Sequence, residues 1–492
     1  MPHSNCPIWL IYLSVPLFFI LVNEYYFQPL MPHLFESDNR RIIQLLLLAV
    51  IGLSLILSSR WREEWMRSFL SLPKLTYRLL SLFFVMGILS ATLTPLPKYA
   101  FLQVSLYFLL FCLALSVTSL HRQTPKACNT GLMLSIVVAM ACYCIYAFMA
   151  YGFEQLRYAA HPTLGYEMPA LAWPDFVNPR FLMQFISWSL PFMVVPMLLH
   201  RKILGSWVWG CFAIASYAWC LDFANQSRIV PIQIVVVSVM ILSIFKRQAL
   251  PWLKLQLYTL IVGLILYILL FHILLSSGIR DLVNYDDPSR LLLWKTSVEL
   301  AIHHPLLGVG PLHFPYYAYP LENIAAHPHN ALLLIAAEWG LIVSLGLLGL
   351  IIWGFCRWVK TMRQATLQDP AAQTYAIALT ASLLAGALDA MVDGIIVMPL
   401  SQVMLAIVLG WMLALYAQYQ NQAPQPVKAA YLRLLAILAV LSLIAGAHGI
   451  WPDVLYLMQN QDFYILQCKH NCLLNPDFWT QGWIQFYGQT AS

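Results

Sequence analysis

Long apolar segments alternate with short polar ones along most of the chain. A helix needs about 20 apolar residues to cross the hydrocarbon core of a bilayer, and about thirteen segments near this length are bounded by charged residues, proline or polar loops. Their limits are 8–22, 42–58, 76–93, 99–119, 131–151, 181–199, 205–221, 229–245, 252–275, 329–356, 374–394, 398–418 and 431–451. The pattern predicts an all-α polytopic membrane protein with about 13 transmembrane helices.

The composition of the 492-residue chain agrees with this prediction. Apolar and aromatic residues make up 61% of the chain and charged residues only 10%, whereas soluble domains are about 25% charged. The mean hydropathy is +0.71. The 27 Lys and Arg residues only slightly exceed the 21 Asp and Glu residues and form no basic face, which argues against nucleic acid as a partner.

The distribution of positive charge favours a cytoplasmic N-terminus, because short cytoplasmic loops retain Lys and Arg during insertion. With this orientation the inner loops hold 17 of these residues and the outer segments hold the other ten. Thirteen spans then place the tail from Trp451 onward on the outer side.

The chain is predicted to have four regions. They are an N-terminal bundle of about nine spans (1–275, with an outer loop at 152–180), a large outer loop (276–328), C-terminal transmembrane helices (329–451) and an outer tail (452–492). Long loops in compact proteins are usually functional or disordered. The large loop contains a predicted helix at 288–304, with Asp287 as N-cap, Pro288 in the first turn and Pro305 as the stop.

This loop helix carries apolar residues at helical spacing. Leu291, Trp294, Val298 and Ala301 fall on one side of it. We therefore expect the helix to lie on the membrane surface or against the bundle, as a lid-like element outside the membrane.

Eight of the ten cysteines lie in or beside apolar segments or on predicted cytoplasmic loops, as expected of small packing residues. Cys468 and Cys472 lie in the polar tail instead. Their short spacing allows a disulfide if the tail lies in an oxidising compartment.

The most distinctive polar cluster is Ala326-His327-Pro328-His329-Asn330, at the start of a long apolar segment. Pro328 fits the first turn of a helix, which places His329 and Asn330 at the mouth of the bundle. A histidine there can act as a general base near neutral pH. The alternative is a helix N-terminus flanked by interfacial imidazoles.

Arg290 lies in the first turn of the predicted loop helix. Free backbone N–H groups at such a position favour an anion, so a guanidinium beside them suits a diphosphate. The alternative is an ion pair with Asp286 or Asp287.

Two more arginines lie at outer helix ends. Arg228 has no acidic neighbour in sequence closer than Asp222, and Arg180 follows Asn178 with Gln184 one turn later. An arginine that faces the bundle requires an anionic partner. The alternatives are snorkelling to lipid phosphates for Arg228 and an interfacial anchor for Arg180.

Asp389 and Asp393 are four residues apart and are expected to share one helix face. They either orient the arginines, hold a catalytic proton or form structural hydrogen bonds. Glu338 lies about two and a half turns beyond His329 on the opposite face, so we do not expect it to orient that histidine.

The large loop is also rich in possible metal ligands, which are His303, His304, His313, Glu322, His327 and His329. Their spacing matches no HExxH or paired CxxC pattern, so no metal is expected. The chain has no P-loop, GxGxxG or Asp-x-Asp motif, which disfavours a soluble nucleotide donor. Gly308-Val309-Gly310-Pro311 is predicted to form a turn.

Three sequence runs resemble the O-antigen ligase superfamily of the Wzy_C type. They are NQSRIVPI at 225–232, DDPSRLLLWKTSVELAIHHPLLGVGPLHF at 286–314 and HPHNALLLIAAEWGLIVSLGLLGL at 327–350. The superfamily includes O-antigen ligases, related polymerases and bacterial protein O-oligosaccharyltransferases. The resemblance departs at Ile229-Val230-Pro231, where the family's Ser-Arg motif usually continues with small residues.

The resemblance implies inverting, metal-independent transfer of a glycan from a polyprenyl diphosphate to an acceptor hydroxyl, without a cofactor. Transfer would take place on the periplasmic side of a bacterial inner membrane. By motif, Arg228 and Arg290 would bind the donor diphosphate and His329 would activate the acceptor, with His327 as the alternative base. Arg180 is a further diphosphate candidate.

The acceptor class is predicted from two further features. The tail LNPDFWTQGWIQFYG and the Asn-Pro-Arg at 178–180 resemble superfamily members that glycosylate type IV pilins or other proteins. We therefore expect transfer of a preassembled oligosaccharide to a protein hydroxyl. The alternatives are ligation to lipid A core, polymerisation of O-antigen units and non-enzymatic transport of a lipid-linked glycan.

Overall fold

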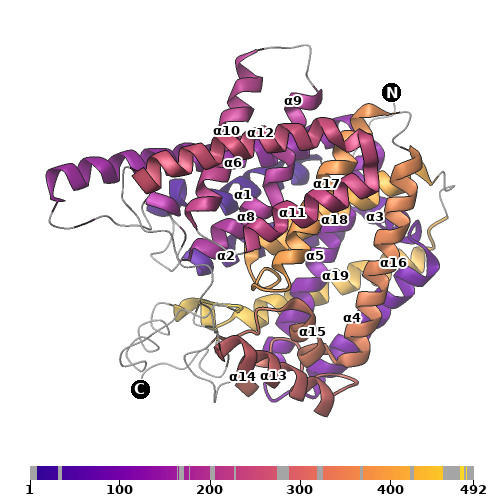
Figure 1. Cartoon of the computed structure of the whole chain (residues 1–492). Helices are drawn as coiled ribbons and strands as arrows, with labels where there is room; N and C mark the ends of the chain where they lie inside the picture. Colours follow the sequence, from indigo (N-terminus) through magenta and orange to yellow (C-terminus); the bar gives the residue numbers. More distant parts are fainter. Residues whose placement is uncertain are drawn as a thin grey trace.

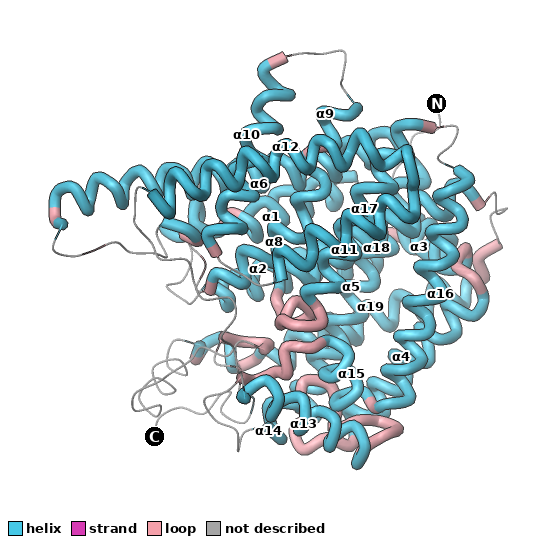
Figure 2. The backbone as a smooth tube through the Cα atoms, in the orientation of Figure 1, coloured by secondary structure: helices cyan, strands magenta, loops and turns pink. Residues whose placement is uncertain are grey.

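The computed structural model describes residues 8–30, 36–162, 165, 171–174, 176, 178–199, 205–225, 229–273, 288–318, 325–365, 369–420, 426–457, 477–480, 482 and 484. These residues form helices, turns and loops, and no strand occurs among them (Figure 2). Several predicted site residues lie outside the described part, namely Arg228, Asp286, Asp287, Glu322, Cys468 and Cys472. The tail disulfide and the role of Arg228 therefore stay predictions.

The helices follow the predicted spans closely (Figure 1). They are α1 Ile8–Val22, α2 Glu36–Leu57, α3 Ser59–Leu70, α4 Lys74–Thr92, α5 Pro97–Gln123, α6 Pro125–Ala160, α8 Pro179–Met193, α9 Val195–Leu199, α10 Ser206–Ala224, α11 Ile229–Phe245, α12 Leu250–Tyr267, α13 Pro288–His303, α14 Phe314–Ala318, α15 Ala331–Trp339, α16 Leu341–Ala365, α17 Pro370–Asp389, α18 Pro399–Tyr419 and α19 Ala429–Ile450.

Eleven helical stretches among the described residues are long and apolar enough to cross a membrane. One of them, Ile229–Ile273, contains both α11 and α12, joined by a short 3-10 turn. The first predicted span is helical as α1, but its 15 residues are too few for it to count among the eleven. The prediction of an all-α polytopic membrane protein is confirmed.

Helix α5 lies at the centre of the bundle, where it packs against α2, α4, α18 and α19 (Figure 1). Small residues permit its close approach to α18, since a β-carbon at Gly410 would lie 2.2 Å from the carbonyl oxygen of Ala114. The hydroxyl of Thr118 donates a hydrogen bond of 2.9 Å to the Gly410 carbonyl. Close backbone approach at glycine is typical of helix packing in membranes.

One predicted span is wrong. The apolar segment 329–356 does not form a single helix, because α15 ends at Trp339 and α16 begins at Leu341. Gly340 between them has a φ of 93°, in the region that favours glycine. The membrane-crossing element is therefore α16, and α15 is a short helix packed against α13.

The segment between α13 and α14 forms a turn, as its glycines predict. Gly308 and Gly310 have φ values of 66° and 112°. A β-carbon at Gly308 would lie 2.3 Å from the carbonyl oxygen of Glu338, so this turn packs directly against α15.

The predicted loop helix is present as α13, but the four apolar residues expected on one side of it are not buried alike. Leu291 and Val298 are 69% and 43% exposed, whereas Leu293, Ser297 and Ala301 are buried against the neighbouring helices. Apolar residues surround α13 on several sides, so their spacing alone did not determine which side is covered.

Arg41 on α2 links three distant parts of the chain. It is 1% exposed. Its guanidinium donates hydrogen bonds to the side chains of Gln44 and Gln402 and to the backbone carbonyls of Val397, Asp477 and Phe478. A buried cation is tolerated when its donors are satisfied in this way. Arg41 therefore fixes the C-terminal segment 477–480 and the turn before α18 against α2.

Candidate active site

The turn between α17 and α18 brings a carboxylate beside a histidine. His329 Nδ1 lies 3.4 Å from Asp393 Oδ1, and the two side chains are 18% and 15% exposed. The ring of His327 packs edge-on against that of His329, with 4.4 Å between the ring centroids. His327 is buried. The two predicted histidines thus lie together, and His329 is the one that faces the carboxylate.

Asn330 fixes the start of α15 to this turn. Its side-chain oxygen accepts a hydrogen bond of 3.0 Å from the Leu333 N–H, as an N-cap does. Its amide nitrogen donates to the Met391 carbonyl at 3.0 Å. The Ala331 N–H donates to the Ala390 carbonyl at 2.7 Å. Asn330 therefore supports the site by joining two chain segments that are distant in sequence.

The backbone of His329 adopts an unusual conformation. Its φ is 51°, in the left-handed region that non-glycine residues rarely occupy. Such a conformation costs on the order of 1 kcal/mol and persists only where the surroundings hold it. The peptide before it is held from α13, because Trp294 Nε1 donates a hydrogen bond of 2.9 Å to the Pro328 carbonyl. Strained residues of this kind cluster at functional sites.

The environment of Asp393 keeps this carboxyl group ionised. Gln184 Nε2 donates to Oδ2 at 3.2 Å, and the Gly394 N–H donates to Oδ1 at 2.8 Å. Burial alone would raise the pKa of Asp393, but His329, the charge of Arg180 and the Gly394 N–H together lower this pKa to about 2. Because the pKa lies below the unfolded value of about 3.9, ionisation of Asp393 stabilises the fold above pH ~4, and this contribution is lost as the pH falls towards 2.

Two of the three predicted arginines lie around the same turn. Arg290 Nη1 on α13 donates a hydrogen bond of 2.9 Å to the carbonyl of Val392, the residue before Asp393. Arg180 lies in the first turn of α8, close enough for its charge to lower the pKa of Asp393. Both side chains are half-buried. The structure thus brings His329, Asp393, Arg290 and Arg180 to one end of the bundle.

Two supporting residues have structural contacts away from the histidines. Asn178 is the N-cap of α8, where its side chain accepts a hydrogen bond of 3.0 Å from the Arg180 N–H. Asp389 accepts a hydrogen bond of 2.7 Å from Gln233 on α11. The prediction that Asp389 and Asp393 share a helix face is wrong, because α17 ends at Asp389 and Asp393 lies in the following turn.

The remaining polar groups near the loop have other partners. His313 is buried; its Nδ1–H donates to the Pro311 carbonyl, and its Nε2 accepts from the Leu96 N–H at 3.2 Å. Glu338 accepts a hydrogen bond from the Phe314 N–H at 3.1 Å. Within the described residues, no group of three or more His, Cys, Asp and Glu side chains could hold a metal ion.

Part of the candidate site lies in a segment that matches a known protein family. Residues 213–354 match the family model described as O-antigen ligase (Wzy_C). The matched part includes Arg290, His327 and His329, whereas Arg180 and Asp393 lie outside it. No curated protein matches the chain.

Proposed function

We propose that the chain, whose residues 213–354 match the O-antigen ligase family model, transfers a preassembled oligosaccharide from a polyprenyl diphosphate to a hydroxyl group of a pilin-like acceptor protein. The observation that carries this proposal is the contact between His329 and the ionised Asp393, with Arg290 and Arg180 around the same turn. The resemblance of the tail to pilin-modifying members supports a protein as the acceptor.

The geometry suits removal of a proton from the acceptor. Nδ1 of His329 faces Asp393, so Nε2 is the nitrogen available to take the proton of the acceptor hydroxyl. The hydroxyl oxygen then attacks the anomeric carbon of the first sugar, and the bond from that carbon to the diphosphate oxygen breaks with inversion. Asp393 orients the imidazole and stabilises the imidazolium that forms.

The arginines act on the diphosphate leaving group. Diphosphate is already a good leaving group, so no general acid is required there. Arg290 and Arg180 would stabilise the growing negative charge through charge-assisted hydrogen bonds to phosphate oxygens. This division of roles requires no metal ion or cofactor. Arg228 is a third candidate for the same role on the basis of its motif.

We place this chemistry at the periplasmic face of a bacterial inner membrane, with the N-terminus in the cytoplasm and the C-terminal tail in the periplasm. The excess of Lys and Arg in the predicted inner loops supports this orientation. The diphosphate headgroup of the lipid donor would then reach the site from the outer leaflet.

A reconstituted assay tests the proposed function. The purified chain is incubated with a polyprenyl diphosphate-linked oligosaccharide and, in separate reactions, with a pilin-derived protein, lipid A core or no acceptor. We expect glycan on the protein only. Glycan on lipid A core would indicate a ligase, and elongation of the donor's own glycan would indicate a polymerase. Movement of donor between leaflets without any transfer would indicate a transporter.

Gly394→Ala is expected to impair transfer without unfolding the chain. A β-carbon at this position would lie 2.2 Å from Nε2 of His327, so the imidazole must move and will disturb the ring of His329. Displacements of about 1 Å at a reacting group reduce rates by roughly 10–100-fold. The transfer rate is compared with that of Gly346→Ala, where no atom lies within 4 Å of the added carbon. Equal rates for the two variants would contradict the proposed importance of this contact.

A further inference from the structure

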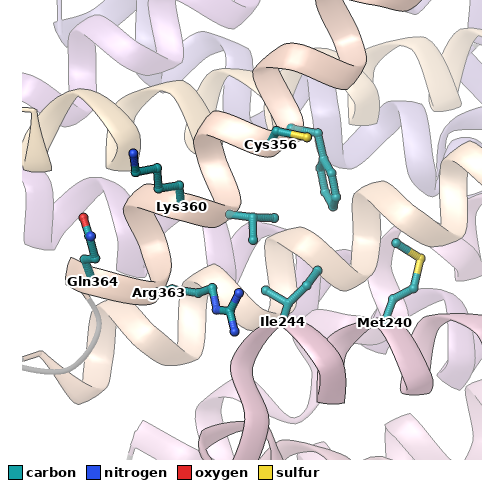
Figure 3. A pocket seen from close by; sticks show the side chains of 8 residues that line it. Met240, Ile244, Cys356, Lys360, Arg363 and Gln364 are labelled. Atoms are coloured by element: carbon teal, nitrogen blue, oxygen red, sulfur yellow. The ribbon is translucent and has the colours of Figure 1, made fainter.

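A groove of about 570 Å³ lies between α11 and α16 (Figure 3). The residues that line it are Met240 and Ile244 on α11 and Phe355, Cys356, Val359, Lys360, Arg363 and Gln364 on α16. None of them takes part in the candidate active site.

The groove lies towards the opposite face of the membrane from that site. Helix α15 starts beside His329, and α16 follows it for 25 residues, which corresponds to about 37 Å. Helix α17 then returns and ends at Asp389, just before the turn that carries Asp393. The C-terminal end of α16, where the groove is lined, is therefore distant from the start of α15 (Figure 1).

The groove is apolar at one end and cationic at the other. Met240 lies at one end, and Cys356 and Ile244 lie nearer its middle (Figure 3). Lys360 and Arg363, both exposed, lie with Gln364 at the other end. No acidic residue is among the eight that line the groove, all of which the structure describes.

We propose that this groove binds one anionic phospholipid. The phosphate would accept hydrogen bonds from Lys360 and Arg363, and an acyl chain would lie over Ile244, Phe355 and Val359. Basic pockets between transmembrane helices favour anionic headgroups, and each cation near the surface contributes to that preference. A zwitterionic headgroup binds less well because its own ammonium is repelled by the two cations. The site is independent of the proposed transferase reaction.

The exposed thiol of Cys356 provides a direct readout. The full chain is purified in a neutral detergent and treated with N-ethylmaleimide, and alkylation of the peptide that contains Cys356 is followed by mass spectrometry. We expect phosphatidylglycerol to slow this alkylation at least about tenfold. Phosphatidylcholine and inorganic phosphate are expected to change it less than about twofold.

Charge variants test the headgroup contact. Lys360→Gln and Arg363→Gln are each expected to raise the phosphatidylglycerol concentration required for half-protection roughly fivefold. Arg357→Gln is the matched control, since Arg357 is an exposed cation on the same helix but does not line the groove. Rates with and without lipid are compared within each variant, which removes the effect of local charge on thiol reactivity.

Three results would overturn the proposal. The first is equal protection by phosphatidylcholine, which would indicate that the groove binds lipids through apolar contacts without selecting the headgroup. The second is an equal loss of protection in Arg357→Gln, which would assign the effect to general surface charge. The third is unchanged protection in both Lys360→Gln and Arg363→Gln.

Discussion

His329→Ala is expected to lower the rate of glycan transfer by about 10²–10⁴-fold, the contribution that general base catalysis usually makes. The variant is expected to insert and fold normally, because the His329 side chain is partly exposed and Asn330 still caps α15. Transfer to the acceptor protein is measured at saturating donor. The matched control is His303→Ala, an exposed histidine at the end of α13. Full activity of His329→Ala would refute the base assignment.

The second histidine serves as an internal comparison. His327→Ala removes the ring that packs against His329 but leaves the contact with Asp393 in place. We therefore expect a smaller loss of rate than for His329→Ala. A larger loss of rate in His327→Ala would indicate that His327, and not His329, is the general base.

The pH dependence of the wild-type rate separates the imidazole from the carboxylate. Asp393, with its pKa lowered to about 2, stays ionised throughout the range from pH 5 to 8. Histidine is the side chain that ordinarily titrates in that range, and a protonated imidazole cannot accept the hydroxyl proton. A fall in rate as the pH decreases from 8 to 5 would therefore be assigned to the base and not to Asp393.

Arg290→Lys is expected to lower kcat/KM for the lipid donor by roughly 30-fold, which corresponds to about 2 kcal/mol of transition-state stabilisation. A lysine keeps the charge but lacks the fork that forms two parallel hydrogen bonds with a phosphate. Steady-state rates at varied donor concentration measure the effect.

The control for Arg290 is Lys295→Gln on the same helix. The Lys295 side chain is 71% exposed and forms a surface ion pair with Glu299, so its removal is expected to change the rate less than twofold. Because Arg290 also donates to the Val392 carbonyl, the thermal unfolding midpoint is measured alongside. A lower unfolding midpoint with an unchanged rate in Arg290→Lys would indicate that Arg290 stabilises the fold and does not bind the diphosphate.

Much of the fold could be predicted from the apolar pattern alone. A bilayer requires each crossing segment to satisfy its own backbone hydrogen bonds, so long apolar runs become helices with few alternatives. The pattern predicted one continuous helix across Gly340, because hydropathy does not reveal the positive φ at which α15 ends. It also misled on α13, where contact with α15 determines the buried side.

The candidate site was predicted only in its separate parts. The histidine cluster and Arg290 lie in two neighbouring recognisable sequence runs, and the structure places them around the same turn. The contact of Asp393 with His329 could not be predicted, because it depends on α16 and α17 crossing the bundle and returning. Arg41 was missed altogether because an arginine at a helix start resembles any interfacial cation in sequence.

Arg41 also joins segments of the chain that are synthesised at very different times. Its acceptor at Phe478 is 437 positions further along the chain. A nascent polypeptide can therefore form the contacts of Arg41 with Val397 and Gln402 well before its contacts with Asp477 and Phe478. A chain that stops before Asp477 would carry a sequestered guanidinium without two of its backbone acceptors, so quality control in the membrane has a physical signal that separates such chains from those that contain this segment.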